Sequence, residues 1–82
     1  MLTLSGELDK LRQADTHIVE AVRRIEQQQI AIASMPPESD QKTRAEDFLL
    51  TMQTTLTQFQ FHREAIIENI ARLRMQNKRD AE

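Results

Sequence analysis

The sequence predicts an all-α chain folded as an antiparallel, coiled-coil-like two-helix hairpin, and three observations support this fold class. Apolar residues recur at alternating steps of four and three in both halves of the chain, which is typical of a heptad seam. The only two prolines, Pro36 and Pro37, stand side by side between the halves. The residue numbers of side chains expected to face each other add up to an almost constant total, as they do in two antiparallel helices.

The first helix is expected at about residues 5–34. Ser5 is a suitable N-cap, and acidic residues follow it in the first turn, where the helix dipole favours negative charge. Pro36 disfavours helical geometry at the residue before it and Pro37 cannot continue the hydrogen-bond ladder, so the helix must end before them. Its predicted seam consists of Leu4, Leu8, Leu11, Asp15, Ile18, Val22, Ile25, Gln29 and Ile32.

A loop at about residues 35–40 is expected to lead into a second helix at about residues 41–77. This helix could be capped by Ser39 or Asp40, or it could begin later, at the capping box of residues 43–46. The earlier start is favoured because it leaves a loop of the usual length between neighbouring helices. The second seam consists of Ala45, Leu49, Met52, Leu56, Phe59, Arg63, Ile66, Ile70 and Leu73.

Each predicted seam contains one charged residue, Asp15 in the first and Arg63 in the second, and the two fall opposite each other. A single charge in such a seam is costly, whereas two opposite charges compensate each other and can fix the register of the helices. We therefore expect an ion pair between Asp15 and Arg63.

The chain has 82 residues, of which 39% are hydrophobic and 29% are charged, and this predicts a single folded domain over residues 1–82. A core made by only two helices is thin, so further burial is expected. If Asp15 and Arg63 are placed at heptad position a, the g positions of both helices form a nearly uncharged flank. We expect a homodimeric four-helix bundle formed through Ala14, Ala21, Gln28, Phe48, Thr55 and His62. The alternative is a monomeric hairpin with a wider apolar stripe.

Two histidines, His17 and His62, lie near carboxylates, but their spacing is not that of the Glu-x-x-His motif found in bundle metal sites. No catalytic or phosphate-binding motif is present, and a narrow helix pair offers no obvious substrate cavity. The sequence therefore predicts no enzyme activity, no metal site and no cofactor. His62 could make the expected interface sensitive to pH, or it could simply be hydrogen-bonded to Asp15 or water.

The sequence contains no cysteine, no secretion signal at its start and no apolar run long enough to span a membrane, and these features favour a cytoplasmic protein. The net charge of −2 gives no long-range attraction to phosphate. Basic residues near the end of the second helix are diluted by acidic ones and lack aromatic neighbours, which disfavours nucleic-acid binding. These basic residues are Arg72, Arg74, Lys78 and Arg79.

Leu50 and Phe61 point away from the predicted seam. They could form a site for an unidentified protein partner or be scattered surface residues, which are common. The expected function is a small self-associating protein-interaction or regulatory module. The alternative is a small nucleic-acid-associated regulator that uses the basic end of the second helix.

The run at residues 14–25, the pair Ala45-Glu46 ahead of Leu49-Leu50, and His62-Arg63 together resemble a family of short bacterial hypothetical proteins. The similarity covers roughly residues 11–70, and many members have a second histidine where this chain has Phe59. The resemblance implies a helical hairpin in a bacterial cytoplasm and implies no catalytic residue.

Overall fold

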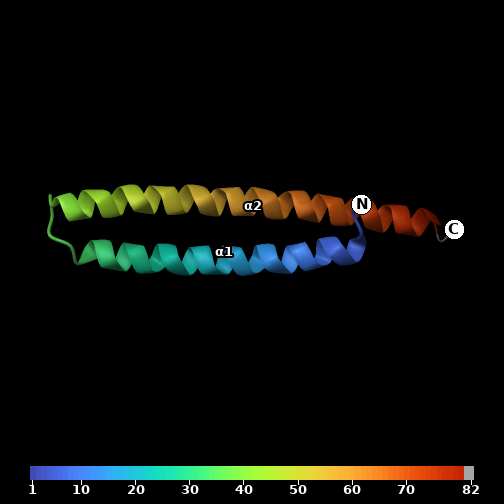
Figure 1. Ribbon diagram of the computed structural model, residues 1–82, viewed down its shortest axis with the longest axis horizontal. Helices are drawn as coiled ribbons and strands as arrows, with labels where there is room; N and C mark the ends of the chain where they lie inside the picture. The colour runs from blue at the N-terminus through green and yellow to red at the C-terminus, as the bar shows by residue number, and fades with distance from the viewer. Residues whose placement is uncertain (81–82) are drawn as a thin grey trace.

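The computed structural model describes residues 1–80, which form two antiparallel helices, α1 (Leu4–Ala33) and α2 (Asp40–Asp80). The helices lie side by side along the length of α1, and a short connection at one end reverses the chain (Figure 1). The molecule is a rod with extents of 66 × 16 × 14 Å. The predicted all-α hairpin is thereby confirmed.

The first residue of α1 is Leu4, and its N-cap is Thr3 rather than the expected Ser5. Thr3 has an extended backbone, and its hydroxyl accepts a hydrogen bond from the amide of Gly6 at 3.0 Å. A Cβ atom on Gly6 would lie 2.9 Å from this hydroxyl, so the glycine leaves room for the cap. The side chain of Thr3 therefore satisfies one free amide of the first turn, and Ser5 lies inside the helix.

The connection between the helices begins after Ala33, where the amide of Ser34 donates to the carbonyl of Ala31 at 3.3 Å. At its other end, the hydroxyl of Ser39 accepts a hydrogen bond from the amide of Lys42 at 3.1 Å and so caps α2. Between them, Glu38 adopts a left-handed conformation with φ of 62°. Within the described residues, α2 begins one residue earlier than expected and continues past residue 77, the expected end.

The residues of α2 predicted to face α1 are all buried or half-buried, but the buried face of α1 is rotated from the predicted one. Leu8, Val22 and Gln29, which were expected in the seam, are exposed at its edge. In their place, the residues one heptad position earlier turn toward α2, namely Glu7, Ala14, Ala21 and Gln28. The other apolar residues of the predicted seam do face α2, as expected: Leu4, Leu11, Ile18, Ile25 and Ile32.

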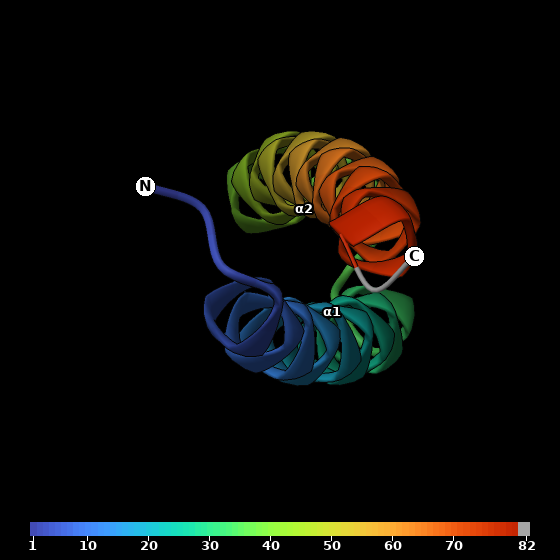
Figure 2. The same ribbon diagram turned by 90° about the vertical axis from the view of Figure 1, so that its right-hand side faces the viewer.

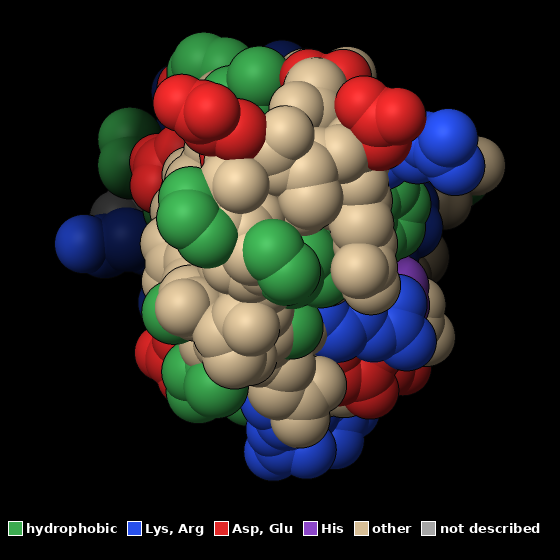
Figure 3. All heavy atoms as spheres, turned by 90° about the vertical axis from the view of Figure 1, so that its left-hand side faces the viewer, with side chains coloured by type: hydrophobic (Ala, Val, Ile, Leu, Met, Phe, Trp, Pro, Cys, Tyr) green, Lys and Arg blue, Asp and Glu red, His purple; other side chains and the backbone are tan. Residues whose placement is uncertain are grey.

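The two helices wind around each other (Figure 2). Their hydrophobic core is thin, as expected for a pair of helices. Its main cluster consists of Ala14, Ile66 and Ile70, against which Leu4 and Leu11 pack. Two further buried residues, Ile25 and Ala45, lie toward the connection. At that end of the rod, hydrophobic side chains form small groups separated by backbone and polar atoms (Figure 3).

Within residues 1–80, neither helix contains an apolar stretch long enough to cross a bilayer.

Candidate interaction surface

An open groove of about 310 Å³ lies between the two helices on the side of heptad positions c and g. Phe48, which is 57% exposed, lies in this groove. A shallower hollow shares Arg24, Phe48 and Met52 with it and continues the groove toward the connection. The residues that line the groove are His17, Glu20, Ala21, Arg24, Phe48, Thr51, Met52, Thr55 and Phe59.

The two walls of the groove differ in character. The α1 wall carries one acid and one base, Glu20 and Arg24, whereas the α2 wall carries no charged side chain. The ring of His17 lies against that of Phe59, with 5.7 Å between the ring centroids. The groove therefore offers an apolar strip beside a wall with no net charge, a combination suited to a protein partner rather than to a small polar substrate.

The groove includes only part of the predicted dimer interface. Ala21, Phe48 and Thr55 lie in it, but Ala14 is only 4% exposed and is covered by α2. The amide of Gln28 is used within the hairpin, where it donates to the carbonyl of Ala45 at 3.1 Å. Small side chains allow two helices to approach closely, and at Ala14 the approaching helix is α2 of the same chain.

His62 also belonged to the predicted interface, and the structure leaves its side chain exposed and outside the groove lining. His17 was not among the predicted interface residues, and Met52 and Phe59 were predicted as seam residues alone. The structure places all three in the groove lining. The sequence signal for Met52 and Phe59 was their spacing from Phe48 on one side of α2, but no comparable signal marked His17.

Arg63 and Asp15 form an ion pair between α2 and α1, with 2.5 Å from Nε to Oδ1. The Arg63 side chain is 36% exposed and the Asp15 side chain is 50% exposed. The hydrogen bond that Arg63 donates to Asp15 and the negative charge of Asp15 raise the pKa of Arg63. The pair lies at the edge of the seam, because the rotation of α1 moves position a outward.

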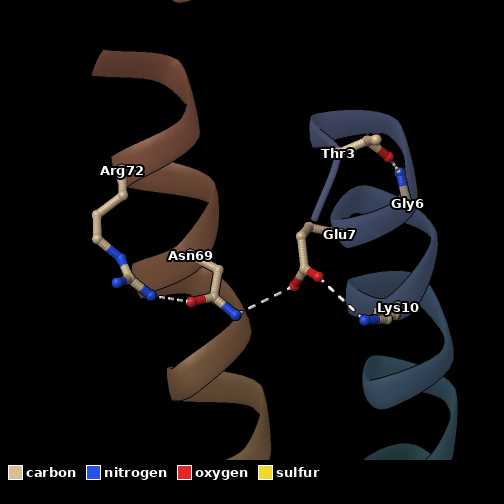
Figure 4. Close-up of polar contacts among 6 residues, drawn as sticks. All are labelled: Thr3, Gly6, Glu7, Lys10, Asn69 and Arg72. Atoms are coloured by element: carbon tan, nitrogen blue, oxygen red, sulfur yellow. Dashed lines mark hydrogen bonds and ion pairs between the residues drawn. The ribbon is translucent and has the colours of Figure 1, made fainter. Parts of the chain in front are cut away.

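A second polar contact between the helices centres on Glu7, which is only 1% exposed (Figure 4). Its Oε1 accepts from Nζ of Lys10 at 3.0 Å and its Oε2 accepts from Nδ2 of Asn69 at 3.4 Å. The Asn69 oxygen in turn accepts a hydrogen bond from Arg72. No sequence pattern predicted the burial of Glu7, which depends on α2.

The pKa of Glu7 lies below its ordinary value, mainly because of the hydrogen bond from Lys10. Burial works in the opposite direction, while Asn69 and the charge of His62 add to the lowering. Both carboxylate oxygens have partners within the fold, so the arrangement joins the helices.

Across residues 1–80, no group of three or more His, Cys, Asp or Glu side chains is placed to share a metal ion.

Comparison of the chain with protein-family models, with curated proteins and with solved structures gives no match. A functional assignment therefore has to come from the surfaces of the hairpin itself.

Proposed function

We propose that the hairpin is a protein-interaction module that pairs with a second copy of itself through the groove between α1 and α2. The observation that carries this proposal is an excess of accessible surface. The chain exposes 6523 Å². A compact monomer of its mass, 9.6 kDa, would expose about 5,100 Å², so the excess is about 1,400 Å². A standard interface covers about 800 Å² on each partner and fits within that excess.

The apolar wall of the groove is self-complementary. Phe48, Met52, Thr55 and Phe59 follow each other at steps of four, three and four, a spacing that reads the same in both directions. In an antiparallel pair of α2 helices, Phe48 would face Phe59 of the second copy and Met52 would face its Thr55. Such a two-fold interface contains two aromatic pairs, which are strong anchors at the centre of an interface.

Sedimentation equilibrium of the wild-type chain and of a matched pair of variants tests this assembly. Phe48→Glu places a charge in the groove and should give the mass of a monomer. Phe61→Glu makes the same change at an exposed phenylalanine outside the groove lining and should leave the dimer intact. A wild-type chain with the mass of a monomer, or equal masses for the two variants, would contradict the proposal.

Circular dichroism of each variant separates loss of pairing from loss of folding. The hairpin depends on little core, so Phe48→Glu could unfold the chain together with the dimer. Thr55→Lys is then the informative variant, because Thr55 is half-buried in the groove and lies outside the main core cluster. A helical Thr55→Lys chain that still has the wild-type mass would count against the groove.

A second candidate function is nucleic-acid binding by the basic end of α2, and one observation favours it. α2 extends past the start of α1 (Figure 1). Within residues 1–80, Arg74, Lys78 and Arg79 near its end form no ion pair. Retention on DNA or RNA that weakens with salt would support it, and Arg74→Glu with Lys78→Glu should abolish that retention. An absence of retention at low salt would remove this candidate.

A further inference from the structure

The face of α2 that lies outside the groove lining carries a second apolar stripe, the outer stripe, formed by Leu50, Thr54, Thr57 and Phe61. Steps of four, three and four place these residues on one side of the helix. Leu50 is 62% exposed and Phe61 is 72% exposed. They are separated by three helical turns, or roughly 16 Å along the axis.

The two threonines in the outer stripe need no outside partner for their hydroxyl protons. Thr54 donates from Oγ1 to the carbonyl of Leu50 at 3.0 Å, and Thr57 donates to the carbonyl of Gln53 at 3.1 Å. A protein surface can therefore cover the stripe without leaving a threonine donor unsatisfied, which would otherwise oppose binding.

The surrounding sequence is unusually free of charge for an exposed helix. No Asp, Glu, Lys or Arg occurs between Asp47 and Arg63. The groove accounts for one side of this stretch, whereas Leu50 and Phe61 lie outside the groove lining. The outer stripe is thus a separate surface.

Both ends of the outer stripe are acidic. Asp47 lies one turn before Leu50 and Glu64 one turn after Phe61, and both are exposed. Neither forms an ion pair with another residue in the range 1–80. The two carboxylates lie roughly 25 Å apart along the axis.

These acidic ends determine which occupants fit the stripe. A second copy of the stripe would bring acid against acid, whether the two helices ran parallel or antiparallel. Phosphate groups of nucleic acids or anionic lipids would be repelled in the same way. A partner with cations at both ends of an apolar face is complementary.

We propose that the outer stripe docks an amphipathic helix from a different protein, with apolar residues at steps of four, three and four and with Lys or Arg at both ends. Recognition would follow the packing of one amphipathic helix on another, with apolar anchors giving affinity and end charges giving register and selectivity. This site is independent of the groove, because the two surfaces share no residue.

Two hydrocarbon-stapled helical peptides provide the test. Both carry four leucines at the stated steps, one with lysines and the other with glutamates at both ends. We expect the lysine peptide to bind at least about tenfold more tightly by fluorescence anisotropy, in line with typical electrostatic selectivity. Amide chemical shifts should move between residues 50 and 61. Equal binding, no binding, or shifts confined to the groove would overturn the proposal.

Variants distinguish stripe recognition from simple charge attraction. Asp47→Lys with Glu64→Lys should reverse the preference between the peptides. Phe61→Glu should abolish binding of the lysine peptide, whereas Phe48→Glu, if the chain remains helical, should leave it unchanged. If the lysine peptide still binds the Phe61→Glu variant, charge attraction alone explains its binding and the stripe is not recognised. If the Phe61→Glu variant has a lower sedimentation mass than the wild type, the stripe pairs with itself, and this outcome also refutes the proposal.

Discussion

Arg63 of α2 donates a hydrogen bond from Nε to Oδ1 of Asp15 on α1 over 2.5 Å, and both side chains remain partly exposed to solvent. Forty-eight positions separate these residues in the sequence, so the contact fixes how the two helices are aligned. Its exposure limits its energetic contribution, because water screens the attraction and already solvates each group. The pair therefore specifies the register more than it stabilises the fold.

The exposure of this pair predicts a small effect for Asp15→Ala. Removing the carboxylate leaves Arg63 near water rather than in a closed core, so the melting temperature should fall by less than about 5 °C. Thermal unfolding followed by circular dichroism measures this change. A much larger loss would mean that the pair is buried in solution.

Replacement of both Asp15 and Arg63 by leucine should restore or exceed the wild-type melting temperature. Two leucines at the seam edge would add apolar contact, and no charge would remain without its partner. The comparison requires both single leucine variants as controls. A double variant less stable than either single variant would show that the ion pair contributes more than apolar contact at this edge.

Glu7 should make the hairpin sensitive to acid. Because the fold holds the pKa of Glu7 below 4.5, its carboxylate stabilises the hairpin above about that pH, and this stabilisation is lost as the pH falls through the lowered pKa. Urea unfolding between about pH 5 and pH 3 should therefore show a flatter decline in stability for Glu7→Gln than for the wild type. Glu46→Gln, at an exposed position, is the control and should keep the wild-type slope.

Among the core residues that the structure describes, truncation of Ile66 should lower the free energy of unfolding the most. It is 2% exposed and belongs to the main cluster, so Ile66→Ala should lower the free energy of unfolding by about 2–4 kcal/mol. The matched control is Ile30→Ala, since Ile30 is 72% exposed and should change stability by less than about 0.5 kcal/mol. Equal losses in urea unfolding would contradict the position of the core.

Replacing Glu38 by glycine should stabilise the hairpin. Its φ of 62° lies in the left-handed region, which costs a residue with a Cβ atom about 1 kcal/mol. Glu38→Gly should therefore raise the melting temperature, although part of the gain is lost to the greater freedom of glycine in the unfolded chain. Ser34→Gly, at a φ of −97°, should lower the melting temperature and serves as the control.

The sequence was sufficient to predict two antiparallel helices and the side of α2 that faces α1. Large apolar residues mark most turns of that side of α2, so the pattern indicates the inward face clearly. The adjacent prolines require a break, and Ser39 supplies a cap immediately after it. Local chemistry was enough for these features.

The N-terminal cap and the inward face of α1 were less certain from sequence. Thr3 and Ser5 are both competent caps, and only the backbone geometry shows that Thr3 accepts from Gly6. On α1, more than half of the predicted seam faces inward as expected, but the large residues Leu8 and Val22 lie at the exposed edge. Small and polar residues carry little signal of the inward face by themselves.

The sequence by itself therefore determined the two helices, their reversal and the approximate register, because periodicity, capping and breaking residues act locally along one chain. Only the tertiary structure decided that Ala14 and Glu7 face inward and that Phe48 lies in a groove. The rotation of a helix about its own axis depends on how closely both helices can pack at once. A small alanine allows that approach, and the buried Glu7 carboxylate is acceptable only because Asn69 of α2 and Lys10 satisfy it.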